Sequence, residues 1–200
     1  GRSCPKSCFW NYKRARHIER KKKRGDCMHL SPLFKKGVSF IEFIRQDKDM
    51  YQEKTLEIYH AIEIDEALKK EIQKIHVPIH VLVFAEIWCP DCMINVPILQ
   101  KMADLNPNFK IAILPKKGYE KHMEALNPSS KPKMPTFVFL DEDFQPIGVF
   151  VEQPKALEEI NRRGKKAEIL VAKRKYRKGE FSNETIQEIL DIIQPHISQD

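Results

Sequence analysis

Two cysteines separated by two residues are the side chains of this sequence best suited to do chemistry. They lie in the run Trp88-Cys89-Pro90-Asp91-Cys92, which directly follows an apolar, strand-like stretch and opens a helix-like one. At a helix N-terminus, unpaired backbone N–H groups and the positive end of the macrodipole would stabilise the Cys89 thiolate. The thiolate, rather than the thiol, attacks disulfides. The placement therefore predicts a redox-active dithiol.

A structural metal site is the alternative use of a paired cysteine motif. It would need two further ligands, and residues 78–200 contain no other cysteine. The histidines of that region show no paired ligand spacing; they are His80, His122 and His196. We therefore expect no metal at this motif. We also expect no dissociable cofactor, because the dithiol itself would carry the two electrons.

The elements around the motif form an alternating pattern. Residues 79–85 are apolar apart from His80 and rich in β-branched side chains, which predicts a central strand buried on both faces. A helix from the motif to about residue 106 and a strand over 109–114 would complete a parallel, right-handed crossover. A short helix over about 119–126 precedes two strands, 136–140 and 145–151, which we expect to pair as a hairpin.

Helical patterns flank this unit on both sides. Helix-like spacing begins at Ser31 and continues to Ile44, and it recurs over about 49–62 and 65–75. We therefore assign residues 28–76 to a helical N-terminal extension. Residues 77–200 form the second unit, with one helix over 154–176 and a C-terminal amphipathic helix over 182–194.

A second motif lies about 40 residues after the cysteines, where Met134-Pro135-Thr136 opens the predicted hairpin. The two motifs, in this order and within these elements, resemble the thioredoxin superfamily. The likeness is greatest to bacterial thioredoxin-family proteins that carry a helical N-terminal extension. The resemblance implies an α/β, thioredoxin-like fold: a central mixed sheet flanked by helices, with extra N-terminal helices and a C-terminal helix.

The resemblance also implies roles for individual residues. Cys89 would be the nucleophile and Cys92 the resolving thiol of a thiol–disulfide oxidoreductase active in cell redox homeostasis. Pro135 would be the cis-proline beside them. The substrate would be bound by Trp88, Pro90, Met134 and Pro135. The partners expected on this basis are disulfide-containing proteins or small-thiol substrates, together with a reductase or thiol donor.

The sequence departs from the thioredoxin pattern at its acidic residues. Thioredoxins bury an aspartate six residues before the nucleophile, whereas this chain has Val83 there. Glu86 is the nearest upstream acid, and it could either transfer protons in place of that aspartate or be a solvated loop carboxylate. Asp91 could favour the helix N-terminus or raise the thiol pKa by opposing the thiolate. These departures leave open an alternative function, a non-catalytic binding module that uses the same fold.

The basic character of the chain is concentrated at its N-terminus. Residues 1–27 hold ten Lys/Arg and two acidic residues, whereas residues 28–200 hold 25 and 26. We therefore do not expect the fold to bind nucleic acid. We hypothesise that translation starts at Met28, which would make residues 1–27 a non-native or disordered basic segment.

Hydropathy indicates no membrane attachment. There is no apolar run of about 18 residues, the length a membrane span requires, and no signal peptide is visible. We therefore expect a cytoplasmic protein without a membrane partner, a compartment in which a C-x-x-C pair is more often catalytic than structural.

Overall fold

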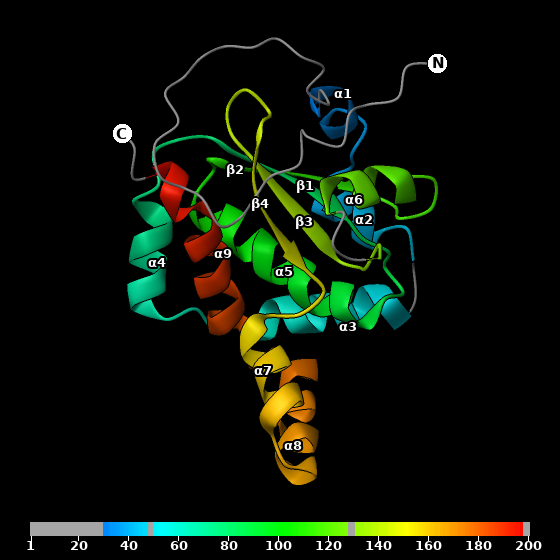
Figure 1. Cartoon of the computed structure of the whole chain (residues 1–200), viewed down its shortest axis with the longest axis vertical. Helices are drawn as coiled ribbons and strands as arrows, with labels where there is room; N and C mark the ends of the chain where they lie inside the picture. The colour runs from blue at the N-terminus through cyan, green and yellow to red at the C-terminus, as the bar shows by residue number, and fades with distance from the viewer. Residues whose placement is uncertain (1–29, 48–49, 128–130, 198–200) are drawn as a thin grey trace.

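A mixed four-stranded sheet in the order β2-β1-β3-β4 forms the centre of the molecule (Figure 1). The computed structural model describes residues 30–47, 50–127 and 131–197. The segment 1–27 lies outside these ranges. The strands are β1 (Ile79–Phe84), β2 (Phe109–Leu114), β3 (Thr136–Leu140) and β4 (Pro146–Val151).

The strand pairing confirms the predicted crossover and hairpin. β1 pairs in parallel with β2, in the register Ile79 opposite Phe109. β3 is antiparallel to both β1 and β4. The carboxyl ends of β1, β2 and β4 therefore lie at one edge of the sheet, and the amino end of β3 lies there too.

Helices cover both faces of the sheet. One core cluster includes Val81 and Val83 of β1 and is packed under α3 (Met50–Ala61), α5 (Pro90–Leu105) and α9 (Ser182–Ile197). The alternating residues Leu82 and Phe84 join a second cluster with α1 (Ser31–Phe34) and α6 (Glu120–Leu126). All six residues of β1 are buried, as the continuous apolar run predicts.

The N-terminal region differs from the continuous helical pattern expected over 31–44. It forms two short helices, α1 and α2 (Phe40–Ile44), and Val38 between them bridges Ile113 of β2. The chain passes close to β2 at Gly37, where a Cβ would lie 2.6 Å from the Cβ of Ala112. Ser39 then starts α2 with a reciprocal capping box to Glu42. α4 (Glu66–Gln73) completes this region.

The prediction of a single helix over residues 154–176 is wrong. The segment forms two helices, α7 (Lys155–Arg163) and α8 (Lys166–Arg177). Gly164 separates them in an extended conformation, and a Cβ on it would lie 2.6 Å from the carbonyl oxygen of Ile160. α8 then begins anew, with the backbone N–H of Lys165 donating to the Glu168 carboxylate.

α7 and α8 pack against each other and project away from the sheet (Figure 1). No helix in the described ranges has both the length and the apolar character needed to cross a membrane.

Candidate active site

The cysteine motif lies where the sequence predicts, between the end of β1 and the start of α5. Cys89 is the N-cap residue of α5, with extended backbone angles, and Pro90 begins the helix. The Cys89 side chain is 7% exposed, and Cys92, one turn into the helix, is fully buried. The two sulfurs are free thiols. A nucleophile at the rim with a partner behind it is the arrangement that dithiol exchange requires.

The surroundings of Cys89 favour its thiolate. A hydrogen bond with the Cys92 thiol has the largest effect, and the backbone N–H groups of Cys92 and Asp91 act in the same direction. Burial and the negative charge of Asp91 oppose them. The net result lowers the pKa of Cys89 to about 7. A larger share of the Cys89 thiols is therefore ionised at neutral pH than for an ordinary cysteine.

The second cysteine is held in the protonated state. Burial raises the pKa of Cys92 well above its ordinary value, and the neighbouring Cys89 adds to the rise. The backbone of Glu86 opposes this shift only in part. The difference between the two thiols distinguishes an attacking sulfur from a resolving one.

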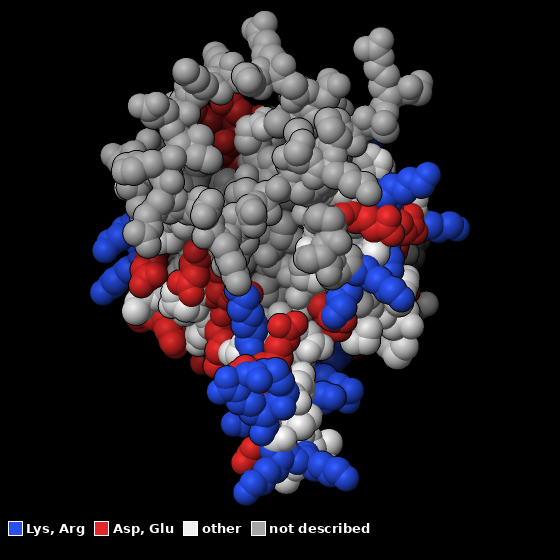
Figure 2. Space-filling model, in the orientation of Figure 1, with Lys and Arg blue, Asp and Glu red and all other residues white. Residues whose placement is uncertain are grey.

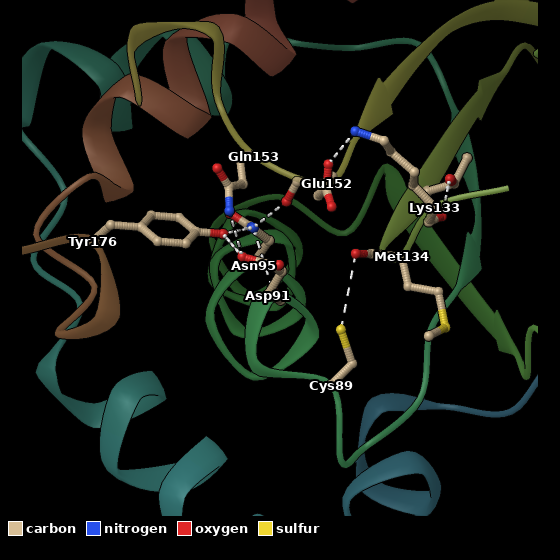
Figure 3. A network of polar contacts seen from close by, with 9 residues as sticks. Cys89, Asp91, Asn95, Lys133, Met134, Glu152, Gln153 and Tyr176 are labelled. Carbon is tan, nitrogen blue, oxygen red and sulfur yellow. Dashed lines mark hydrogen bonds and ion pairs between the residues drawn. The ribbon is translucent and has the colours of Figure 1, made fainter. Parts of the chain in front are cut away.

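The loop before β3 faces the cysteines. The Met134–Pro135 peptide bond is cis, as the family resemblance implies. The carbonyl oxygen of Met134 lies 3.8 Å from the Cys89 sulfur and accepts a hydrogen bond from it (Figure 3). Met134 is half-buried and Pro135 is buried. The structure thus brings together the two motifs that are separate in the sequence.

The other predicted substrate-binding residues lie on the surface beside Cys89. Trp88 is 54% exposed, which excludes a core role for its ring among the described residues. Pro90 is also exposed. Their contact with substrate stays a prediction.

Glu86 is half-buried and hydrogen-bonded, which differs from the fully solvated loop carboxylate that the sequence also allows. Its carboxylate accepts a hydrogen bond from the backbone N–H of Lys116 at 3.0 Å and is within reach of that of Lys117 at 3.5 Å. It thereby fixes the loop after β2 against the loop after β1. Transfer of a proton by Glu86 stays a prediction.

Asp91 lies at the centre of a polar network that the sequence did not reveal (Figure 3). One carboxylate oxygen accepts hydrogen bonds from the Tyr176 hydroxyl at 2.9 Å and from the Gln153 amide at 3.0 Å. Burial is the main influence on the Asp91 pKa and raises it, while Gln153 and Tyr176 lower it in part. Asp91 is thus a half-buried acidic residue beside the cysteines. The position at which thioredoxins usually bury an aspartate is occupied here by the fully buried Val83.

Asn95, one turn after Asp91, joins this network from a fully buried position. Its amide nitrogen lies 2.7 Å from the Tyr176 hydroxyl and 2.9 Å from the carbonyl oxygen of Glu152. The sequence offered one indication that Asn95 makes buried hydrogen bonds, namely that it is a polar residue in an otherwise apolar stretch of helix. Its partners lie 57 and 81 residues away in sequence, so spacing could not identify them.

Comparison with known proteins agrees with this fold. The thioredoxin family model matches residues 37–169. A protein of unknown function from Pseudomonas aeruginosa is 29% identical, with a TM-score of 0.72 over 82% of this chain and 96% of that protein. An HIV epitope scaffold is 28% identical, with the same TM-score and coverages. No curated protein matches the chain. The match over two thirds of the sequence, together with the shared fold, shows that this chain belongs to the thioredoxin family.

Proposed function

We propose that the protein is a thiol–disulfide oxidoreductase in which Cys89 attacks and Cys92 resolves. The observation that carries the proposal is the position of Cys89: at the N-cap of α5, with a pKa of about 7, against the Met134 carbonyl of the cis-proline loop. Family membership is consistent with this chemistry. A cytoplasmic location, with a separate reductase or thiol donor, belongs to the same proposal.

The reaction balances without a dissociable cofactor. The Cys89 thiolate attacks one sulfur of a substrate disulfide, which forms a mixed disulfide and releases the other substrate sulfur as a thiolate. Cys92 then loses its proton and attacks the Cys89 sulfur, releasing the second substrate thiolate. The substrate gains two electrons, which leave on its two thiolates. These thiolates take up the proton that Cys92 loses and one proton from solvent, replacing the one that Cys89 gave up when it ionised. A Cys89–Cys92 disulfide remains on the protein. Once Cys89 is in the mixed disulfide, its thiolate charge no longer raises the Cys92 pKa, which favours ionisation of Cys92 at this step.

Cleavage of insulin disulfides by the reduced full chain tests the proposal. We expect Cys89→Ser to abolish cleavage, and Cys92→Ser to accumulate a mixed disulfide with the substrate. Simultaneous replacement of Cys4, Cys8 and Cys27 by serine is the matched control and should leave cleavage unchanged. Unchanged turnover in Cys89→Ser would overturn the assignment in favour of a non-catalytic module.

A further inference from the structure

The helical hairpin formed by α7 and α8 is the most prominent surface feature outside the cysteine site. We refer to residues 155–178 as the arm. Its two helices pack against each other, and the arm extends away from the sheet (Figure 1). It meets the body through its buried residues, Ala172 and Tyr176 of α8 and Leu157 of α7, which all belong to the main core cluster. Because the arm projects from the body, its side chains are accessible to a partner protein.

The arm is strongly basic, while the remaining fold is acidic. The arm contains ten Lys/Arg and three acidic residues, whereas the rest of residues 28–200 contains 15 and 23. Figure 2 shows these basic side chains crowded over the projecting helices. Glu159 pairs with Arg162 and Arg163. Within the described part of the chain, no ion pair involves the run Lys173-Arg174-Lys175.

Two large apolar side chains lie within this basic surface. Leu170 is 63% exposed and Val171 is 53% exposed. Arg174 and Lys175 each follow one of them by four residues, so they are its neighbours on the helix surface. Apolar contact surrounded by positive charge fits an acidic protein surface with an apolar side chain. Single-stranded nucleic acid would need exposed aromatic rings, and Tyr176, the arm's one aromatic residue, is buried.

The base of the arm is attached to the cysteine motif. The Tyr176 hydroxyl of α8 and the Gln153 amide, just before α7, both donate hydrogen bonds to Asp91. Asp91 lies two residues after Cys89 on the first turn of α5. The arm also follows β4, whose end lies at the same sheet edge as the end of β1. A protein lying along the arm would therefore reach the edge that carries Cys89.

We propose that the arm is a docking surface for an acidic protein segment, which it delivers to Cys89 for disulfide exchange. The delivery step rests on the proposed oxidoreductase function, whereas docking itself does not. Long-range attraction between the arm and an acidic partner would raise the rate of encounter, and the Leu170–Val171 contact would slow dissociation.

Three probes separate docking from chemistry. The first is a Glu-rich peptide containing a leucine and an internal disulfide, and the second is its Lys-rich counterpart with the same cysteine loop. The third is 2-hydroxyethyl disulfide, which is small and uncharged. The rate of oxidation of the reduced full chain is measured with each probe at low and high salt. Calorimetric titration with the Glu-rich peptide, its cysteines replaced by serine, measures docking without redox chemistry.

The arm variant reverses three charges, Lys173→Glu, Arg174→Glu and Lys175→Glu. The matched control reverses three body charges, Lys35→Glu, Lys36→Glu and Lys110→Glu. We expect the arm variant to lose at least about tenfold in rate and affinity for the Glu-rich peptide at low salt. Its rate with 2-hydroxyethyl disulfide should be unchanged. The control variant should retain most of the binding.

Equal losses in the two variants would overturn the proposal, because they would report net charge rather than the arm. Binding to anionic lipid vesicles or to a single-stranded oligonucleotide that is tighter than binding to the peptide, and that the arm variant loses, would also overturn it. Arm-dependent binding without any reaction with 2-hydroxyethyl disulfide would uphold docking and contradict the oxidoreductase function. A double variant, Leu170→Ser with Val171→Ser, should weaken peptide binding at high salt as well as at low salt. It removes apolar contact, which salt does not screen.

Discussion

The hydroxyl of Tyr176 donates a hydrogen bond of 2.9 Å to the carboxylate of Asp91, across 85 residues of sequence. This contact joins the second helix of the arm to the residue between the two cysteines. It also places a half-buried carboxylate beside the thiols, in a family whose usual buried acid is here replaced by Val83. The network around Asp91 therefore links the redox motif, the arm and the end of β4.

Tyr176→Phe should destabilise the fold by about 1–3 kcal/mol, because Asp91 and Asn95 would each lose a buried partner. Urea denaturation measures the free energy of unfolding. Tyr119→Phe is the matched control: Tyr119 is half-buried, and no hydroxyl contact is seen for it within the described residues, so its loss should be small. Equal effects of the two substitutions would contradict a role for the Tyr176 hydroxyl.

Asp91→Asn should lower the pKa of Cys89 below its value of about 7. The aspartate charge opposes the thiolate, and asparagine removes the charge while keeping an oxygen that can accept from Tyr176. The pH dependence of iodoacetamide alkylation at Cys89, followed by peptide mapping, measures the shift. Asp104→Asn, near the far end of α5, should leave the pKa unchanged. A higher Cys89 pKa in Asp91→Asn would show that the network, rather than the charge, dominates.

In the wild-type chain, alkylation of Cys89 should rise with pH through a midpoint of about 7 and then level off. The sign follows from the thiolate: its fraction falls about tenfold for each pH unit below the pKa. Cys92 should stay unreactive through this range, because burial keeps it protonated. Peptide mapping distinguishes the two thiols. If Cys92 were alkylated at a lower pH than Cys89, the roles assigned to the two thiols would be reversed.

The sequence was sufficient to predict the order of the elements from β1 to β4 and the position of both cysteine side chains. Apolar runs and turn residues determine these features locally. It was not sufficient to predict the break at Gly164, where an added Cβ would meet the carbonyl oxygen of Ile160 on the preceding turn. Nor could it predict the bridge at Val38, which depends on how closely β2 approaches Gly37. The Asp91 network could not be predicted either, because Tyr176 and Gln153 are distant from Asp91 in the sequence and reach it only in the folded chain.

Gly37→Ala should destabilise the protein by about 1–3 kcal/mol, the usual cost of overpacking. The added Cβ would meet the Ala112 side chain at 2.6 Å and the backbone of β2 at 2.8 Å, which would displace the Val38–Ile113 bridge. Thermal or urea denaturation measures the change. Lys36→Ala, at the exposed neighbouring position, should change stability by less than about 0.5 kcal/mol. An unaffected Gly37→Ala variant would contradict close packing at this edge of the sheet.

Equilibration of the full chain with mixtures of reduced and oxidised glutathione, followed by alkylation and peptide mapping, shows whether Cys89 and Cys92 form a reversible redox couple. We expect a single internal disulfide joining Cys89 and Cys92, which forms and is reduced again as the glutathione ratio changes. Cys4, Cys8 and Cys27 should not be required for it. Absence of a reversible Cys89–Cys92 bond at every ratio would contradict an oxidoreductase function for this site.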